Sequence, residues 1–261
     1  MYANMNNQVL HLANQGATIN QIHNVYSPPE SLLQNWYNRG YHGSYEHNSR
    51  GVIQRFLGYW DCNPTTLIPL SPEESGPLYV EMMGGAAKIM ARGSQLIAEG
   101  KYLHATEILD KLVQAEPDNR MAKDLLADAF EQIGYQQENP GLRNSFLSGA
   151  YELRNDIPTA ATMSTASPDT IRAMSTGQFL DFLGIRMDAR KAEGLNFTMN
   201  LSTPDNGEKF AIELANATLT NIQGFLTENP DLTMTINRSD LEQVMKGATT
   251  LEALIDDGTC R

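Results

Sequence analysis

The sequence predicts two domains of different structural class, an all-α domain followed by an α+β domain. Three observations support this division, and the first is that apolar residues recur at helical spacing through most of residues 1–155. A stretch rich in Ala, Ser, Thr and Pro at 156–170 predicts a linker. Beyond it, three short segments alternate apolar and polar residues, which is typical of strands with one buried face. A chain of 261 residues is long enough to bury a core in each domain.

The first 70 residues are predicted to form short helices separated by turns. NMNNQVLHLANQG has apolar residues at near-helical spacing and stops at Gly16. The SPPE sequence at Ser27–Glu30 predicts a helix start with a capping box, and the following SLLQNWYNRG would end at Gly40. NSRGVIQRFLGYW predicts a further helix, ended by the turn signal Asn63-Pro64. The SPEE sequence at Ser71–Glu74 repeats the start signature.

Residues 86–155 contain an internal repeat. The tripeptide Gly-Lys-Tyr at 100–102 recurs 34 residues later as Gly-Tyr-Gln at 134–136. This period predicts tetratricopeptide-like helical hairpins, which bury a core only by packing on their neighbours. Two amphipathic helices lie within the repeat, and their apolar stripes are predicted to form its core. The stripes are Tyr102, Ala105, Ile108, Leu109, Leu112 and Val113, then Ala122, Leu125, Leu126, Ala129, Phe130 and Ile133.

The second domain is predicted to combine a helix, an antiparallel sheet and further helices. TGQFLDFLGIRMDARKAEG has helical periodicity, whereas NFTMNLS, FAIELA and LTMTI alternate with a period of two. A hairpin turn is predicted at 204–207, between the first two of these strands. Capping boxes at Ser239, in SDLE, and near Thr249, in TTLE, predict two closing helices.

Composition and spacing argue against several classes of function. The formal net charge of −12 is unfavourable for binding nucleic acid, because neutralising phosphates requires clustered Lys and Arg. No apolar run approaches the roughly 20 residues that span a bilayer, so no transmembrane segment is predicted. Cys62 and Cys260 have no CxxC neighbour, so neither a disulfide framework nor a structural zinc site is predicted. His11, His23 and His104 are isolated in the sequence, and no metal ligand is predicted.

One short segment gathers cations, imidazoles and phenols within this acidic chain. The segment is RGYHGSYEHNSRGVIQRFLGYWDCNP, residues 39–64, and it holds Arg39, Arg50, Arg55, His42, His47, Tyr41, Tyr45 and Tyr59. An oxyanion ligand needs cations and hydrogen-bond donors of this kind. The residues alone leave two interpretations open: an anion-binding site, or a packed segment whose arginines form solvated ion pairs.

Three segments, in this order, resemble the C-terminal portion of the zinc-dependent alkyl sulfatases of the metallo-β-lactamase superfamily. They are residues 39–64, the helical block containing AEPDNRMAKDLLADAFEQIGYQQENPGLRNSFLSGAYELRN, and the tail with LNFTMNLSTPDNGEKFAIEL and TMTINRSDLEQVMKGATTLEALI. The resemblance implies hydrolysis of linear alkyl sulfate esters of the dodecyl sulfate type. It also implies a helical dimerisation domain at 1–155, which forms a homodimer. Residues 171–261 would form a sterol-carrier-protein-like α+β domain that stops short of the family's last strand and helix.

The resemblance implies roles for four residues of the 39–64 segment. His47 is expected to be catalytic, binding the sulfate or acting on the leaving group. Tyr59 is expected to lie near the sulfate, Asn48 to support the site and Arg50 to contact the substrate.

The sequence departs from the family pattern at two places. Tyr45 and Glu46 precede His47 where the family usually has an aliphatic residue and Ser, and a carboxylate beside an anionic headgroup is unfavourable. The family binds two zinc ions through an H-x-H-x-D-H motif, and this motif is absent from the chain. No cofactor is therefore expected in this chain, and a zinc-binding metallo-β-lactamase-type domain is its expected partner.

Several functions remain open on the sequence. The chain is the C-terminal part of an alkyl sulfatase (a gene fragment, a split gene or a separately encoded partner), a stand-alone non-catalytic helical scaffold with a lipid-binding domain, or a gene remnant. In the tail, six residues would line an apolar tunnel for an alkyl chain or form an ordinary core. They are Phe179, Phe182, Met187, Met199, Met234 and Met245. The first residues lack a basic region and an apolar run, so the chain as written is expected to be cytoplasmic, and a periplasmic or secreted parent enzyme is left open.

Overall fold

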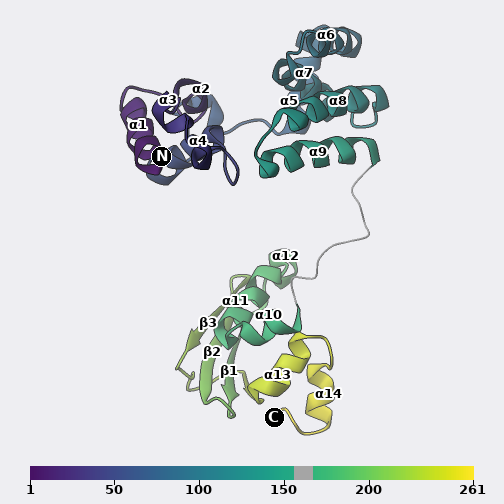
Figure 1. The fold of residues 1–261 in the computed structure, drawn as a ribbon. Coiled ribbons are helices and arrows are strands. Elements are labelled where there is room, and N and C mark those ends of the chain that lie inside the picture. The colour runs from purple at the N-terminus through teal and green to yellow at the C-terminus, as the bar shows by residue number, and fades with distance from the viewer. Residues whose placement is uncertain (156–166) are drawn as a thin grey trace. The chain divides into compact units, whose positions relative to one another are not determined.

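The computed structural model describes residues 1–155 and 167–261 (Figure 1). The chain divides into two compact units, Met1–Ala160 and Ala161–Arg261. Among the helices of the described residues, none is both long enough and apolar enough to cross a membrane.

The linker predicted at 156–170 falls mostly outside the described residues. Its last residues differ from the prediction, because Pro168 already begins helix α10 (Pro168–Ala173). The Ser167 hydroxyl accepts the backbone N–H of Thr170 at 3.2 Å, and proline occupies the first helical position. These local signals favour a helix start, although the composition of the stretch is that of a linker.

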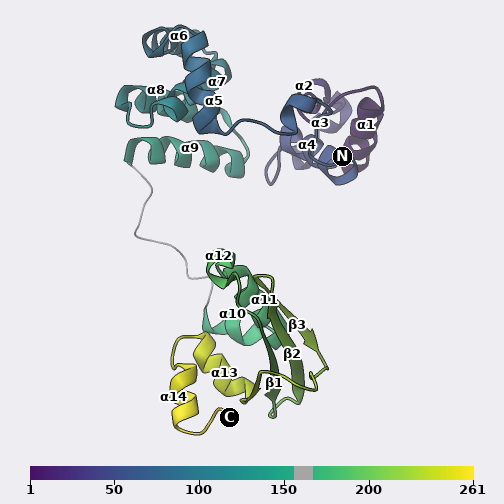
Figure 2. The same ribbon diagram turned by 180° about the vertical axis from the view of Figure 1, so that it is seen from behind.

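Four short α-helices build the first part of the N-terminal unit around a small apolar core (Figure 2). They are α1 (Tyr2–Asn14), α2 (Ile22–Val25), α3 (Glu30–Leu33) and α4 (Tyr45–Leu57), with 3-10 turns η1 (Trp36–Asn38) and η2 (Pro64–Thr66). The core residues are Met5, Val9, Ile22, Tyr26 and Ile53. Helix α4 ends at Gly58, whose φ of 84° is a left-handed conformation that glycine adopts at low cost. The helix therefore stops before the predicted Asn63-Pro64 signal.

The predicted helix start at Ser27 is wrong. The helix begins only at Glu30, after Pro29, and no side chain caps it. A residue that precedes proline is disfavoured in the helical conformation, which keeps Pro28 out of the helix and Ser27 away from its first turn. The predicted continuation to Gly40 is also interrupted, because α3 spans 4 residues and the 3-10 turn η1 follows.

Five further helices complete the N-terminal unit: α5 (Pro72–Met82), α6 (Ala86–Ala98), α7 (Tyr102–Ala115), α8 (Arg120–Gln136) and α9 (Pro140–Asn155). Successive helices from α6 to α9 pack on each other, and α5 packs on α7. The predicted capping box begins α5, because the Ser71 hydroxyl accepts the N–H of Glu74 while the Glu74 carboxylate accepts the N–H of Ser71. The prediction that the apolar stripes form the core is confirmed. The buried residues are Ile89, Leu96, Ala105, Leu109, Leu112, Ala122, Leu126 and Ala129.

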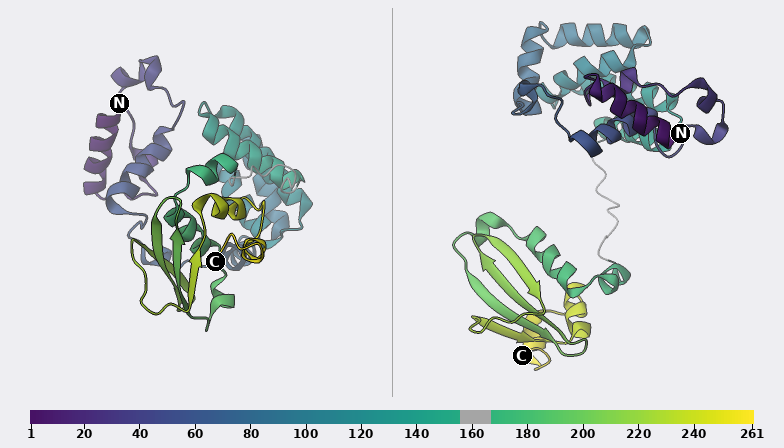
Figure 3. Two further views of the ribbon diagram at one scale, coloured as in Figure 1. Left: turned by 90° about the horizontal axis from the view of Figure 1, so that it is seen from below. Right: turned by 90° about the vertical axis from the view of Figure 1, so that its left-hand side faces the viewer.

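The C-terminal unit contains a four-stranded sheet with helices on one face (Figure 3). Its strands are β1 (Phe197–Thr203), β2 (Glu208–Ala215), β3 (Thr218–Gln223) and β4 (Leu232–Thr235), in the order β3-β2-β1-β4. The remaining helices are α11 (Thr176–Arg186), α12 (Ala189–Ala192), α13 (Arg238–Met245) and α14 (Leu251–Asp256). The core between sheet and helices includes Leu180, Leu201, Phe210, Ile212, Ile236, Leu241 and Cys260.

The sheet is mixed, which corrects the predicted antiparallel sheet. Strands β1 and β2 form the predicted hairpin, but β4 pairs parallel to β1, with Leu201 opposite Met234. The connection after β3 carries the chain from one edge of the sheet to the other. The Asn200 side chain holds this connection, because it donates to the Thr227 carbonyl and accepts the Thr227 N–H, both at 2.8 Å. Strand β3 was not predicted, since its residues are mostly polar and only partly buried.

The start of helix α13 also differs from the prediction. Ser239 was expected to cap it, but the helix begins at Arg238, after Asn237, and Asn237 makes no capping hydrogen bond. The first N–H groups of α13 are accepted instead by Asp205, from the turn between β1 and β2. Helix α14 follows Thr250, whose hydroxyl accepts the N–H of Ala253. A threonine therefore caps the helix, but one residue later than Thr249, and the predicted capping box with Glu252 does not form.

Candidate functional site

Helix α4 carries most of the site residues suggested by the sequence. The Ser44 hydroxyl accepts the backbone N–H of His47 at 3.2 Å and so begins the helix. Ser49 and Ile53 are buried on the opposite side, with 0% and 2% of their surface exposed. His47 and Arg50 are three residues apart and exposed, so they share the outward face. Burial of one side of α4 thus determines where the other side presents its imidazole and guanidinium groups.

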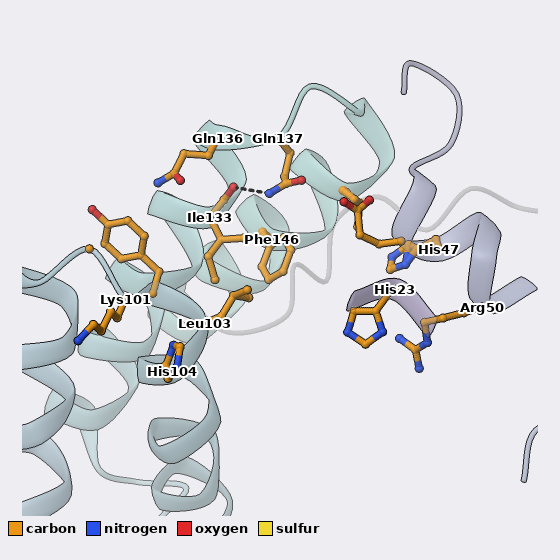
Figure 4. Close-up of a pocket in the computed structure, with 14 residues that line it drawn as sticks. His23, His47, Arg50, Lys101, Leu103, His104, Ile133, Gln136, Gln137 and Phe146 are labelled. Carbon is orange, nitrogen blue, oxygen red and sulfur yellow. Dashed lines mark hydrogen bonds between the residues drawn. The ribbon is translucent and has the colours of Figure 1, made fainter. Parts of the chain in front are cut away.

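A cleft of about 570 Å³ lies between α4 and helices α7, α8 and α9 (Figure 4). This volume is typical of sites for small molecules. One side is formed by His23, Glu46, His47 and Arg50, from α2 and α4. The other side is formed by Gly100, Lys101, Tyr102, Leu103, His104, Ile133, Gln136, Gln137, Leu142 and Phe146.

The polar groups of the cleft are mainly cations and imidazoles. Its lining includes Arg50, Lys101 and three histidines, and Glu46 is the one carboxylate among these residues. The Nδ1 atom of His23 is buried, and within the described part of the chain it has no hydrogen-bond partner. A buried polar atom without a partner costs free energy, and because this nitrogen is shielded from solvent it is not a contact point for a ligand in the cleft.

The side of the cleft built from α7, α8 and α9 carries its apolar side chains, together with Lys101, His104 and two glutamines. Leu103 has 67% of its surface exposed. Covering this leucine with another apolar group would be favourable. Phe146 is held in place by Phe130, with ring centroids 5.7 Å apart at an interplanar angle of 63°. Figure 4 shows Leu103, Phe146 and Ile133 on this side, facing the helices that carry His23, His47 and Arg50.

Two polar contacts join the two sides of the cleft. Arg39 pairs with Glu138 at 2.6 Å, so the expected solvated ion pair is confirmed for this arginine. The Asn139 side chain is buried, donates to the Tyr41 carbonyl at 3.1 Å and accepts the N–H of Leu142 at 2.8 Å. Asn139 therefore caps the first turn of α9 and binds the loop that precedes α4.

The structure places His47 and Arg50 together in the cleft, but not Asn48. The amide of Asn48 lies against Gly43, where an added Cβ would be 2.8 Å from Nδ2 and 2.9 Å from Oδ1. Asn48 thus packs on the loop before α4 instead of lining the cleft. Within the described residues, Arg50 takes part in no salt bridge, so the alternative of an ion pair is not seen for it.

Tyr59 also lies outside the cleft lining, in the loop after α4, with 73% of its surface exposed. Asp61 organises this loop, because it accepts hydrogen bonds from the Asn20 side chain at 2.7 Å and the Thr66 hydroxyl at 2.6 Å. The Thr66 hydroxyl and the Asn63 backbone N–H hold the pKa of Asp61 below its usual value. The loop that presents the Tyr59 phenol to solvent is therefore tied to the segment before α2.

Three residues of the cleft were missed in the sequence. His23 and His104 stand alone there, and Lys101 drew attention only as part of the repeated tripeptide. The fold brings both histidines, and so three of the chain's five, to one cleft with His47. All three residues lie at helix ends: His23 is in the last turn of α2, and Lys101 and His104 are at the start of α7. Their proximity depends on packing between distant segments.

The donor set of this region does not fit a metal ion. Across residues 1–155 and 167–261, no group of three or more His, Cys, Asp or Glu side chains is arranged to hold one. Zinc in proteins needs about three or four such ligands at defined geometry. The cleft can instead bind an anion through cations and imidazoles and contact an apolar group on its opposite side.

Comparison with known proteins identifies the family. The alkyl sulfatase dimerisation family matches residues 18–156, and the alkyl sulfatase C-terminal family matches residues 164–261. A linear primary-alkylsulfatase from a Pseudomonas species is 38% identical over 97% of this chain, which covers 37% of that protein. An alkyl/aryl-sulfatase of Saccharomyces cerevisiae is 39% identical over 96% of this chain, which covers 38% of that protein.

A solved structure agrees with these matches. The stereoselective inverting sec-alkylsulfatase Pisa1 from a Pseudomonas species is 38% identical, with a TM-score of 0.94 over 100% of this chain and 41% of its own. This chain thus spans about two-fifths of the length of these relatives. Because these matches cover nearly all of its sequence, the chain belongs to the alkyl sulfatase family and carries the family's dimerisation and C-terminal regions.

Proposed function

We propose that this chain supplies the dimerisation and C-terminal regions of an enzyme that hydrolyses linear alkyl sulfate esters. The observation that carries the proposal is similarity to alkylsulfatases along almost the entire chain. The names of these relatives include primary, secondary and alkyl/aryl forms. The proposal therefore names the class of ester and does not specify which carbon carries the sulfate.

His47 is the proposed catalytic residue of this chain. It is exposed on α4 and lies in the cleft beside Arg50. An imidazole can donate a proton to the leaving oxygen of a sulfate ester or hydrogen bond to its sulfate, and a guanidinium can neutralise the anion. In this proposal His47 acts on the ester and Arg50 binds the sulfate.

Tyr59 and Asn48 have supporting roles in the proposal. The exposed Tyr59 phenol is a hydrogen-bond donor on a loop organised by Asp61, and it is available to a substrate held against this surface. Asn48 positions the start of α4 through its packing on Gly43. Neither side chain lines the cleft within this chain.

The two zinc ions implied by the family resemblance do not fit the described residues of this chain. In this proposal they belong to a metallo-β-lactamase-type domain that acts as a partner, where they would supply Lewis-acid chemistry. The residues of this chain bind and orient the ester.

The finer features of fold and assembly belong to the same proposal. Residues 1–155 form a homodimer, and α6–α9 are tetratricopeptide-type hairpins, which their pairwise packing and the repeat support. Residues 171–261 form a sterol-carrier-like domain that accepts an apolar chain. A groove of about 590 Å³ beside α10 and α11, which includes Phe182 and Ile185, supports this role. Residues Phe179, Met199, Met234 and Met245 instead pack on the buried core.

Sulfate release from dodecyl sulfate tests the proposal in three samples. They are the chain alone, the chain joined to a zinc-binding domain of the family, and the joined protein with His47→Ala. We expect no turnover by the first, turnover by the second, and a loss of about 10²–10⁴-fold in the third, the range of a general acid.

His42→Ala is the matched control, because His42 is exposed in the same segment but does not line the cleft. It should keep the activity of the joined protein. Full activity in the His47→Ala protein would contradict the site, and an inactive joined protein that has bound zinc would favour a non-catalytic scaffold.

A further inference from the structure

We propose that Asn139 is a positioning residue that sets the separation of α4 from α9. It holds the α1–α4 block (residues 2–57), which carries His47 and Arg50, against the α5–α9 block (residues 72–155). Without its hydrogen bond to Tyr41, the first block moves away from the second and the cleft widens. The part of the inference that concerns catalysis rests on the proposed function of His47, whereas the part that concerns the helix separation does not.

The two blocks have separate apolar cores. The buried core of the α1–α4 block includes Val9 and Ile53, and that of the α5–α9 block lies between Ile89 and Ala129. Among the described residues, the two cores and the partly buried side chains around them have no member in common. Close packing makes each block rigid. The placement of one block against the other therefore depends on contacts at their surfaces.

Asn139 makes a buried contact across this boundary. Its Nδ2 atom donates to the Tyr41 carbonyl at 3.1 Å, and 8% of the residue is exposed. The ion pair between Arg39 and Glu138 crosses the same boundary, but 60% and 42% of the two side chains are exposed. An exposed ion pair contributes little stability, whereas a buried hydrogen bond is costly to leave unmade. Asn139 is thus the stronger of these two links.

The turn that carries Asn139 is itself held in place. Arg143 donates to the Gln137 carbonyl from Nε at 3.0 Å and from Nη2 at 2.7 Å. The Gln137 side chain donates to the Ile133 carbonyl at 3.2 Å, the dashed line in Figure 4. Oδ1 of Asn139 accepts the N–H of Leu142 at 2.8 Å, which orients its amide. Such support keeps a side chain in one geometry, so the position of α9 is passed on to its partner.

The effect reaches His47 through the start of α4. Tyr41 lies three residues before Ser44, whose hydroxyl accepts the backbone N–H of His47 at 3.2 Å. A shift of the Tyr41 carbonyl therefore moves the first turn of α4, and with it His47 and Arg50. A displacement of about 1 Å can lower a catalysed rate about 100-fold. Asn139 thereby controls how closely His47 approaches a substrate held on the opposite side of the cleft.

Asn139→Ser separates this role from helix capping. Serine caps a helix about as well as asparagine does, but its hydroxyl ends one bond short of the Nδ2 atom that donates to Tyr41. Asn144→Ser is the matched control, because Asn144 is exposed on the same helix. Thermal melting of both variants shows that the fold is retained.

Pulsed electron paramagnetic resonance of the full-length chain measures the separation of the two blocks. Spin labels are attached at Gln54→Cys on α4 and Ser148→Cys on α9, both exposed, after Cys62→Ser removes the exposed native thiol. An excess of unlabelled chain isolates the distances within one chain from those across a homodimer. We expect Asn139→Ser to broaden the distance distribution and shift it to longer distances, and the control variant to leave it unchanged.

A double-mutant cycle in the joined protein tests the catalytic part. Asn139→Ser should lower kcat about tenfold with a much smaller change in KM, because the reacting group is misplaced. In the His47→Ala background it should cause little further loss, since no imidazole remains to be positioned. A merely structural defect would lower the rate equally in both backgrounds.

An unchanged distance distribution in Asn139→Ser overturns the inference, as does an equal loss of kcat with and without the His47 imidazole. If this variant loses its fold, Asn139→Asp replaces it at neutral pH, because an ionised aspartate also caps a helix and has no N–H to donate. The distances are measured without catalysis. An inactive joined protein therefore leaves the distance result untouched, and unchanged distances leave the sulfate-release result untouched.

Discussion

Asp205 caps a helix that begins far from it in the sequence. Its carboxylate accepts the backbone N–H of Arg238 at 2.6 Å and that of Ser239 at 3.1 Å. Desolvation by itself would raise the pKa of Asp205, but the hydrogen bonds from these N–H groups outweigh it, so the pKa lies below the usual value. A carboxyl group whose pKa is depressed by folding stabilises the fold above its unfolded pKa, and this stabilisation is lost as the pH falls through the folded value.

Asp205→Ala should therefore lower the free energy of unfolding of the C-terminal unit near neutral pH. We expect about 0.5–1 kcal/mol, the lower part of the range for a capping residue, because Asp205 is exposed to solvent. The difference from the unaltered protein should shrink as the pH falls below about 4, the usual pKa of an aspartate, toward the lower pKa of the folded protein. Urea denaturation followed by circular dichroism at several pH values measures it. A difference that does not change with pH would contradict the capping role.

Asn139 is the second residue whose effect reaches beyond its own helix. Asn139→Ala removes the cap of α9 and the contact with the Tyr41 carbonyl. We expect a loss of about 1–3 kcal/mol in the free energy of unfolding, because the carbonyl and the N–H lose a buried partner. Asn144→Ala is the matched control, since Asn144 is exposed on the same helix. Thermal melting of both variants tests this expectation. Equal melting temperatures would show that the contact of Asn139 contributes nothing to stability.

At the scale of elements, close approach of α6 and α7 depends on a glycine. A Cβ at Gly93 would lie 2.8 Å from Cδ2 and 3.0 Å from Cγ of Leu109, which is fully buried. Because Leu109 is enclosed by core residues, it has little room to move aside. The small residue on α6 and the large residue on α7 are thus one packing unit.

Gly93→Ala and Gly51→Ala should have opposite effects on stability. At Gly93 the added methyl group overpacks the core, and we expect a loss of about 1–3 kcal/mol. At Gly51, inside α4, the methyl group meets no atom within 4 Å. There alanine should add about 0.5–1 kcal/mol, because it loses less backbone entropy than glycine on forming a helix. Chemical denaturation of both variants measures the sign, and a stabilising Gly93→Ala change would contradict the packing account.

At the scale of the whole molecule, the helical unit is expected to mediate self-association. Short helical arrays leave apolar end faces that need covering, and exposed Leu78 and Met82 on α5 are part of such a surface. The family that matches residues 18–156 is described as a dimerisation region. Light scattering of the full-length chain at micromolar concentration should give twice the mass of one chain. A monomer mass under those conditions would contradict the homodimer.

The chain is also expected to purify without stoichiometric zinc. A catalytic zinc needs about three protein ligands, and the described residues offer no such group. Elemental analysis after dialysis should therefore find well under one zinc ion per chain. The chain joined to a zinc-binding domain of the family serves as the positive control. One or two tightly held zinc ions in the isolated chain would show that ligands exist that neither sequence nor structure reveals.

Much of the local structure could be predicted because its causes are local. The capping box at Ser71–Glu74 is complete within four residues, and the stripes of α7 and α8 are read from spacing along a single helix. The hairpin of β1 and β2 follows from alternation and a turn between them. The start at Ser27 was wrong for an equally local reason, the pair of prolines that follows it.

The sequence by itself determined the class of each unit, the helical core and the family resemblance. It also predicted site roles for His47 and Arg50, which the structure places in one cleft. Only the tertiary structure decided that β4 runs parallel to β1 and that Asp205 caps α13. It alone brought His23 and His104 to the cleft of His47. The physical reason is sequence separation: the Asn139–Tyr41 hydrogen bond that joins the sides of this cleft links residues 98 positions apart. Periodicity and capping report on neighbours within a few residues, whereas such contacts form only when whole helices pack.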